Sequence, residues 1–351
     1  MTLLSGSVAD VCEALVATPS EYGEEELVAG HVEERVAGLG LVYERLGNAI
    51  VARTGEGDGV VLVGHLDTVP NWAGGAAARE FDRIVGRGAA DMKGGVAVML
   101  TLAERFASSD RPIVWVFYDR EEGPNAANGI HAVLRDSALL GRPRVGVVLE
   151  PTRGTIHLGA VGTMNADVVF RGRGAHSARP WQGENAISRG VPALARFAAR
   201  EPDFVDVDGL EFADVVTVTT AHGGLARNVV PDEFRLAVNV RVAPGRSLDA
   251  ARAEVEALAG TEAEVAWLDV SPAALPHASS PEVRRFAALS DAEIQPKQAW
   301  TDVATLIEWG VPAFNYGPGD PAQAHQTGEF VMVAALEECE RVLERYLSED
   351  L

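Results

Sequence analysis

The chain has little of what stabilises secreted proteins or anchors proteins in membranes. Among its 351 residues only Cys12 and Cys339 are cysteines, far apart and both in segments with helical spacing. We therefore expect two buried free thiols and no disulfide framework. No segment reaches the roughly 18 apolar residues of a membrane span, and the N-terminus has no basic segment followed by an apolar one. These absences predict a soluble cytoplasmic protein without a membrane partner.

Basic residues are also scarce. Lys and Arg number 30 against 51 Asp and Glu, which leaves a net charge of -21. Binding to a phosphate backbone depends on clustered Lys and Arg, so nucleic acid is a poor candidate partner. Hydrophobic residues make up 47% of the chain and charged residues 23%, as in ordinary globular proteins. A chain of this length exceeds the roughly 250 to 300 residues of a single core, so we expect two domains.

Three apolar runs predict buried strands of a largely parallel sheet, because they are continuous and rich in Val and aromatic residues. They are Val60 to Gly64, Ile113 to Tyr118 and Val145 to Leu149. Ligands of open α/β sheets gather beyond the carboxyl ends of the strands. The residues found there are His65, Glu121, Glu122 and Glu150.

The pattern changes along the chain and then returns. Residues 163–270 read as alternating strands with two helices, in the order strand, helix, two strands, helix, strand, which predicts an inserted α+β domain. Residues 1–162 and 271–351 would form one discontinuous α/β domain with a mostly parallel sheet flanked by helices. Helices are predicted at 8–17, 24–37, 94–105, 185–200 and 248–259, and further strands at 42–45 and 49–53.

Two polar motifs allow both a chemical and a structural interpretation. His65 and Asp67 point to the same side of an extended chain, so Asp67 could orient His65 as a metal ligand, or both could lie in a surface turn. Asp91 follows a glycine-rich stretch and precedes an apolar helix. It could cap that helix or bridge two cations. The negative charges of the adjacent Glu121 and Glu122 repel each other unless both carboxylates bind a shared cation.

The order of several motifs makes the resemblance specific. They are HLDTVP, GRGAADMKGG, EEG, LEPT, AHSARP and AHQTGEF. In this order the chain resembles, over nearly its whole length, the co-catalytic zinc metallopeptidase family that includes aminoacylases, acetylornithine deacetylases and desuccinylases. The resemblance implies two divalent metal ions, Zn²⁺ or alternatively Co²⁺. One would be held by His65, Asp91 and Glu150, and the other by Asp91, Glu122 and His325.

The same resemblance implies roles for neighbouring residues. Glu121 would be the general base of an N-acyl bond hydrolysis, and the peptide bond after Asp91 would be cis. His176 would reach the active site of a partner subunit and stabilise the developing oxyanion, which requires a homodimer. The chain departs from the pattern at Arg120, where many relatives have Asp, so we expect altered electrostatics around Glu121.

The substrate is predicted less directly than the chemistry. Arg179, Asn228 and Arg241 are candidate contacts for a substrate carboxylate, or else surface residues. The stretches 181–186, 301–304 and 311–321 look most like actinobacterial-type desuccinylases, which release succinate from N-succinyl-LL-2,6-diaminopimelate during lysine and diaminopimelate biosynthesis. Acetylornithine or another N-acyl amino acid is the alternative substrate.

Two further classes of function remain open at this point. A binding protein that kept the fold and lost the chemistry would be expected to have lost the base or a ligand, yet all these positions carry competent residue types. An aminopeptidase would favour a recess for an α-ammonium group over one for two carboxylates, and it would cleave peptides but not N-acyl amino acids.

Overall fold

The computed structural model describes residues 4–72 and 75–349, which divide into two compact units. The first unit comprises Met1–Leu158, His277–Gln295 and Thr301–Leu351, and the second comprises Gly159–Pro276 and Pro296–Trp300. Each is described by itself below. Within the described ranges, no helix combines the length and the apolar character needed to cross a membrane.

An eight-stranded sheet forms the centre of the first unit. The strand order is β1-β2-β6-β3-β7-β17-β8-β16. The four central strands β6, β3, β7 and β17 run parallel to one another. The pairs β1–β2, β2–β6 and β17–β8 are antiparallel. The bounds are β1 Val42–Leu46, β2 Ala49–Thr54, β3 Val60–His65, β6 Ile113–Tyr118, β7 Val145–Val148, β8 Ile156–Leu158, β16 Ile294–Pro296 and β17 Ala313–Asn315. The sheet is the predicted α/β arrangement.

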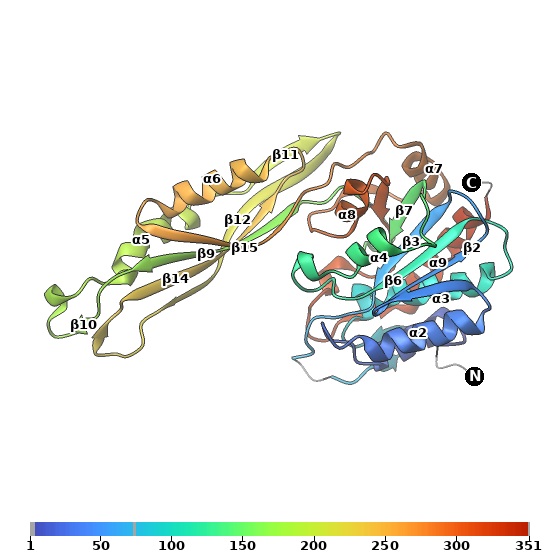
Figure 1. Cartoon of the computed structure of the whole chain (residues 1–351), viewed down its shortest axis with the longest axis horizontal. Coiled ribbons are helices and arrows are strands. Elements are labelled where there is room, and N and C mark those ends of the chain that lie inside the picture. The colour runs from blue at the N-terminus through green and yellow to red at the C-terminus, as the bar shows by residue number, and fades with distance from the viewer. Residues whose placement is uncertain (1–3, 73–74, 350–351) are drawn as a thin grey trace. The chain divides into compact units, whose positions relative to one another are not determined.

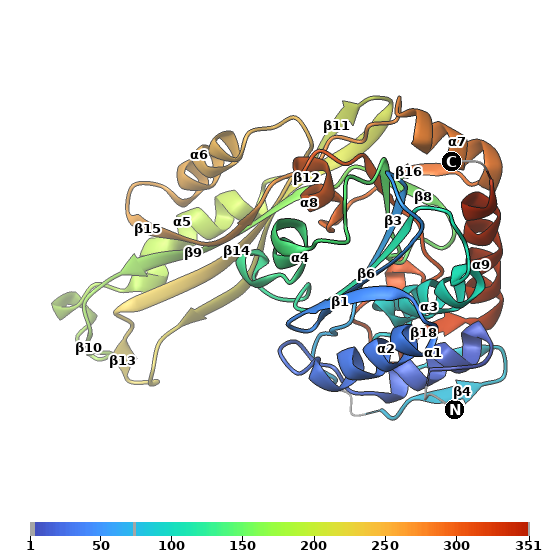
Figure 2. The same cartoon turned by 45° about the vertical axis from the view of Figure 1, so that its right-hand side comes forward.

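Helices cover both faces of this sheet (Figure 2). On one face, alternate residues of β3 and β6 pack against α4 and α8; these are Val61, Val63, Val114 and Val116. On the opposite face, Gly64 lies against α3. All residues of β3 and β6 are buried, which explains their continuous apolar sequences. The helices are α1 Val8–Ala17, α2 Glu26–Gly38, α3 Gly94–Phe106, α4 Ile130–Asp136, α7 Pro281–Ser290, α8 Val303–Glu308 and α9 Val333–Ser348.

Short elements complete the first unit. A three-stranded sheet has the order β18-β5-β4, with β4 at Ala78–Glu80, β5 at Arg83–Val85 and β18 at Phe330–Met332. The turn η1 (Ala89–Lys93) precedes α3, and two more turns are η2 (Asn125–Ala127) and η4 (Pro321–Gln323). Cys12 and Cys339 are buried free thiols, as predicted.

The second unit is built on a five-stranded antiparallel sheet with α5 (Ala186–Ala198) and α6 (Leu248–Ala259) along one face (Figure 1). Burial alternates along β14, because Val238, Val240 and Val242 join the core under the helices and the residues between them lie on the other face. The strand order is β11-β12-β14-β9-β15, with β9 at Gly162–Arg171, β11 at Asp203–Val207, β12 at Leu210–Gly223, β14 at Glu233–Val242 and β15 at Ala263–Ser271. A two-stranded pair, β10 (Ala175–His176) with β13 (Val229–Val230), and the turn η3 (Pro180–Gln182) complete it.

The division between the units differs in detail from the sequence-based one. The sequence placed the boundaries after residues 162 and 270, whereas the structure places them after Leu158 and Pro276. The connecting segments pair with each other, since Ala160 and Ala274 exchange two backbone hydrogen bonds of 3.1 and 2.9 Å. The segment 296–300 also groups with the second unit. The prediction of two strands between the helices of the insertion was wrong, because β11 and the two-residue β13 also lie there.

Candidate metal centre

The carboxyl ends of three neighbouring strands assemble the candidate site. β3 lies between β6 and β7 in the sheet and runs parallel to both. β3 ends at His65, Glu121 and Glu122 follow β6, and Glu150 follows β7. Because parallel strands end at the same edge, side chains that are up to 85 residues apart in sequence become neighbours.

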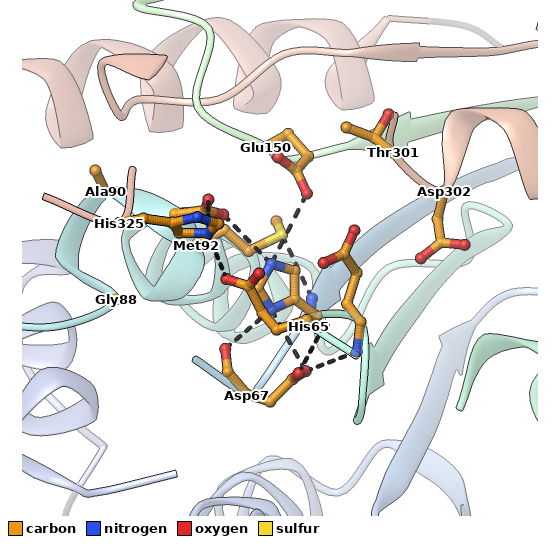
Figure 3. Close-up of polar contacts among 12 residues, drawn as sticks. His65, Asp67, Gly88, Ala90, Met92, Glu150, Thr301, Asp302 and His325 are labelled. Carbon is orange, nitrogen blue, oxygen red and sulfur yellow. Dashed lines mark hydrogen bonds and ion pairs between the residues drawn. The ribbon is translucent and has the colours of Figure 1, made fainter. Parts of the chain in front are cut away.

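A first group with the donor types of a metal site is formed by His65, Asp91 and Glu150 (Figure 3). His65 Nε2 lies 3.4 Å from Asp91 Oδ1 and 3.8 Å from Glu150 Oε1. One atom from each residue can be chosen so that all lie within 4.8 Å of one another. One imidazole and two carboxylates are donors that Zn²⁺ takes in catalytic sites.

A second group is formed by Asp91, Glu122 and His325, also within 4.8 Å. His325 Nε2 lies 3.0 Å from Glu122 Oε1 and 3.6 Å from Asp91 Oδ2. Asp91 therefore directs one carboxylate oxygen at His65 and the other at His325. This is the arrangement of a carboxylate that can bridge two cations. His65, Glu121 and Glu122 make a third such group, which places Glu121 beside both.

The state of His65 fits a metal ligand. Its Nδ1 lies 3.0 Å from the backbone oxygen of Asp67 and 3.5 Å from Asp67 Oδ1, so the neutral ring would carry its proton on Nδ1. Its Nε2 is buried and has no hydrogen-bond partner among the described residues. A lone pair on Nε2 directed at two carboxylates is suited to a cation placed between them.

Asp67 contacts both His65 and the turn that carries Glu121 and Glu122. It is fully buried, and its two carboxylate oxygens accept hydrogen bonds from the backbone N–H groups of Glu121 (3.1 Å) and Glu122 (2.9 Å). Burial opposes its ionisation, but His65 and these two N–H groups outweigh burial and lower the pKa of Asp67. An ionised Asp67 thus orients His65 and holds the turn that carries both glutamates.

Glu121 is a carboxylate surrounded by other carboxylates. Burial raises its pKa well above the usual value, and the nearby carboxylates of Glu150, Glu122 and Asp302 raise it further against the opposing effect of His65. Arg120 is exposed and directs its guanidinium at Asp119, with Nε 3.7 Å from Oδ2.

The structure excludes one of the two interpretations of Asp91. Helix α3 begins at Gly94 and its N-cap is Lys93, so Asp91 does not cap it. Asp91 lies in η1 with extended backbone angles instead, and the peptide bond between Asp91 and Met92 is cis, as the resemblance implied.

The remaining predicted residues belong to the second unit. His176 is exposed in β10, and its Nδ1 accepts a hydrogen bond of 3.0 Å from the Ala178 N–H. The neutral ring must therefore carry its proton on Nε2, which makes Nε2–H a donor. Asn228 is exposed next to β13, and its backbone oxygen accepts a hydrogen bond from Ser177 N–H. The structure therefore brings the segments of His176 and Asn228 together.

The two candidate arginines differ in burial. Arg179 is exposed, whereas Arg241 is half-buried on the face of the second unit's sheet that α5 and α6 leave open. Burial lowers the pKa of Arg241. Among the described residues its guanidinium has no hydrogen-bond or ion-pair partner.

Sequence reasoning missed two buried carboxylates beside the site. Asp302 accepts hydrogen bonds from Tyr118 Oη (2.6 Å), Asn128 Nδ2 (2.8 Å) and Thr305 Oγ1 (2.7 Å). Glu329 accepts from the backbone of the turn that carries Asp91. Both lie in stretches already noticed, 301–304 and AHQTGEF, but their burial becomes apparent only in the structure.

Two overlapping groups of possible metal ligands that share one carboxylate have the donor arrangement of hydrolases that use a pair of metal ions. Comparison with known proteins agrees with this class. Residues 61–349 match peptidase family M20/M25/M40, and the chain belongs to that family.

Relatives with assigned names cover nearly the whole chain. A Mycobacterium tuberculosis protein, provisionally named succinyl-diaminopimelate desuccinylase, is 38% identical over 98% of this chain and 99% of its own length. The succinyl-diaminopimelate desuccinylase of Corynebacterium glutamicum is 32% identical, covering 99% and 97%. The acetylornithine deacetylase of Myxococcus xanthus is also 32% identical, covering 93% and 90%.

Solved structures show the same fold at lower identity. A tripeptidase from Staphylococcus aureus has a TM-score of 0.77 and 21% identity, covering 97% of this chain and 96% of its own. A dinuclear metal binding peptidase from Bacillus subtilis has a TM-score of 0.69 and 16% identity, covering 97% and 96%.

Proposed function

We propose that the protein is a metal-dependent amide hydrolase that removes the succinyl group from N-succinyl-LL-2,6-diaminopimelate, in lysine and diaminopimelate biosynthesis. The observation that carries the reaction type is the pair of ligand groups that share Asp91. The substrate rests on the names of the M. tuberculosis and C. glutamicum relatives and on the matching motifs of the chain.

The proposed cofactors are two divalent ions, with Zn²⁺ the first choice and Co²⁺ the alternative. His65, Asp91 and Glu150 would hold one ion, and Asp91, Glu122 and His325 the other. Such ions, when bound, polarise an amide carbonyl and lower the pKa of water. The mixed nitrogen and carboxylate donors suit zinc.

Glu121 is the proposed general base. Its carboxylate would take a proton from the attacking water and return it to the leaving amine nitrogen as the amide C–N bond breaks. Asp67 supports this role, because its hydrogen bonds to the N–H groups of Glu121 and Glu122 hold the glutamates in place beside His65.

His176 is the proposed donor to the developing oxyanion. Its Nε2–H is free to donate because Nδ1 already accepts from Ala178 N–H. The proposal assigns this donor to the active site of a second copy of the chain, so the active species would be a homodimer in which the second unit dimerises and closes over substrate.

Arg179, Asn228 and Arg241 are the proposed contacts for the carboxylates of the substrate. Arg241 is the best supported of the three. A half-buried guanidinium without a partner among the described residues is costly by itself and favours an incoming carboxylate.

Relative rates on two substrates test the proposal. Purified protein with added Zn²⁺ or Co²⁺ should hydrolyse N-succinyl-LL-2,6-diaminopimelate faster than N-acetylornithine. The Myxococcus relative favours acetylornithine as the second candidate, and faster deacetylation would select it. Cleavage of peptides alone would instead identify an aminopeptidase, and no turnover with metal bound would identify a binding protein.

A further inference from the structure

One buried carboxylate near the candidate centre belongs to neither ligand group. Glu329 is only 2% exposed and lies directly before β18. Its Oε1 accepts hydrogen bonds from Ala90 N–H (2.9 Å) and Asp91 N–H (3.0 Å). Its Oε2 accepts from Gly88 N–H (3.0 Å) and from Arg87 Nη1 (3.0 Å). Four donors therefore converge on one side chain.

These donors come from the turn that carries Asp91, while Glu329 follows His325 by four residues. The two segments are 238 residues apart at the Asp91–Glu329 hydrogen bond. They also meet through the pairing of β18 with β5, where Phe330 is opposite Val85, and through Gly86 N–H, which donates to the backbone oxygen of Glu329 at 2.9 Å. Glu329 thus joins the segment of one candidate ligand to the segment of another.

We propose that Glu329 is a positioning residue that fixes the Asp91 turn against the His325 segment, so that both oxygens of Asp91 are presented to two cations. This inference rests on the proposed metal centre. Its structural basis is that Glu329 binds the N–H of Asp91 itself, and that Asp91 Oδ2 and His325 Nε2 lie 3.6 Å apart.

The role requires a carboxylate rather than any polar group. Each oxygen of Glu329 accepts from two donors, so the NH₂ group of an amide at this position would face two of these donors and could not accept from them. Arg87 contributes a balancing charge, since its side chain is 7% exposed and its guanidinium lies 4.6 Å from the centre of the Trp72 ring. An ionised acceptor of four such bonds is a strong anchor for a turn.

Metal affinity tests the inference independently of turnover. Wild type, Glu329→Gln and Glu329→Asp should be prepared metal-free, checked for an unchanged circular dichroism spectrum, and titrated with Zn²⁺ against a chromogenic chelator. Loss of a residue that orients a ligand weakens metal binding about 10- to 100-fold, and we expect that loss in Glu329→Gln. Glu329→Asp keeps the charge and both oxygens, so it should bind Zn²⁺ more tightly than Glu329→Gln and less tightly than wild type.

Glu340→Gln is the matched control. Glu340 is a buried carboxylate of α9 in the same unit, and its ion pair with Arg105 (3.1 Å) involves neither ligand group. The control should bind Zn²⁺ like wild type. Equal affinity of Glu329→Gln and wild type would overturn the inference, as would equal losses in Glu329→Gln and the control.

The outcomes separate this inference from the proposed function. If wild type binds no Zn²⁺, both the proposed function and this inference are contradicted. Wild type that binds two ions and hydrolyses the succinylated substrate, with Glu329→Gln unchanged in affinity, would remove the inference alone. Should Glu329→Gln fail to fold, Glu329→Asp decides, because an affinity equal to that of wild type would contradict a positioning role.

Discussion

The two units of the chain differ in the burial of their candidate residues: those of the first unit are buried or half-buried except for His325, and those of the second are exposed except for Arg241. In the first unit His65, Asp67 and Glu150 are buried, and His65 lies within 4 Å of both carboxylates. In the second unit His176, Arg179 and Asn228 are exposed. A buried set of charges is arranged by the fold before any ligand arrives, whereas exposed side chains obtain their partners from a substrate or another chain. We therefore expect the first unit to govern metal binding and the second to govern recognition.

The strongest test of this division is Glu121→Gln. Removing the proposed base should lower kcat by about 10²- to 10⁴-fold, because a positioned proton acceptor contributes that much to catalysis. Zinc content should stay near two ions per chain, since Glu121 belongs to neither proposed ligand set. Turnover and metal analysis on the same preparation provide the measurement. Substantial residual turnover would reject the assignment of Glu121.

His176→Ala tests the second unit. We expect kcat to fall about 10²- to 10³-fold, as on removal of an oxyanion donor, while zinc affinity remains unchanged. His222, an exposed histidine of the same unit, provides the control variant His222→Ala, which should retain activity.

Mixing the two inactive variants makes the test of His176 sharper. If His176 acts on a partner subunit, a dimer of one Glu121→Gln chain and one His176→Ala chain retains one intact site. Refolded mixtures should then recover activity that neither variant has alone. A fully active monomer, measured by sedimentation during turnover, would contradict the role in a partner subunit.

Arg241→Ala should act on substrate binding more than on chemistry. Charge-assisted hydrogen bonds of about 1.5 to 3 kcal/mol correspond to a KM higher by about 10- to 100-fold. Arg235 lies on the same strand and face but is already paired with Asp167 at 2.6 Å, so Arg235→Ala is the control. Equal KM changes in the two variants would show that Arg241 has no specific role.

The smallest effect is expected for an ordinary ion pair of the second unit. Burial opposes ionisation of Glu254, but hydrogen bonds from Arg200 (2.9 Å) and Arg246 (2.7 Å) outweigh it and lower the pKa. A carboxyl group whose pKa is lowered in the folded state stabilises the fold at pH values above its pKa in the unfolded state. This stabilisation is lost as the pH falls through the pKa of the folded state. Glu254→Gln should cost about 1 kcal/mol at pH 7.

Hydrogen exchange in α6 at pH 7 and near pH 3 measures this cost. The difference between wild type and Glu254→Gln should shrink as the pH falls, because protonation of Glu254 in the folded state removes the contribution of its charge. A difference that stays constant across this range would mean that packing rather than charge explains the effect.

Comparison of sequence with structure shows where local patterns were sufficient. The apolar runs that ended at His65, before Glu121 and before Glu150 predicted both the sheet and the edge where ligands gather, because buried parallel strands have a continuous apolar sequence. β11 was missed because Asp203–Val207 (DFVDV) is only five residues long, lacks strict alternation of polar and apolar residues, and is separated from β12 only by Asp208 and Gly209.

Other features followed no local pattern. Asp91 has the sequence context of a helix cap, yet α3 starts three residues later. Glu329 looks like one more acidic residue in an acidic protein, and its importance depends on β18 pairing with β5 across more than two hundred residues. Hydrogen bonds to a distant backbone leave no periodic trace in sequence.

The sequence alone determined the fold class, the strand ends and the residue types of the candidate centre, because burial and hydrogen-bonding geometry restrict which residues can form a strand. Tertiary structure alone decided that Asp91 turns one oxygen toward each histidine and that Glu329 accepts hydrogen bonds from the turn that carries Asp91. These are contacts between segments brought together by sheet pairing, and their distances depend on the packing of the whole first unit.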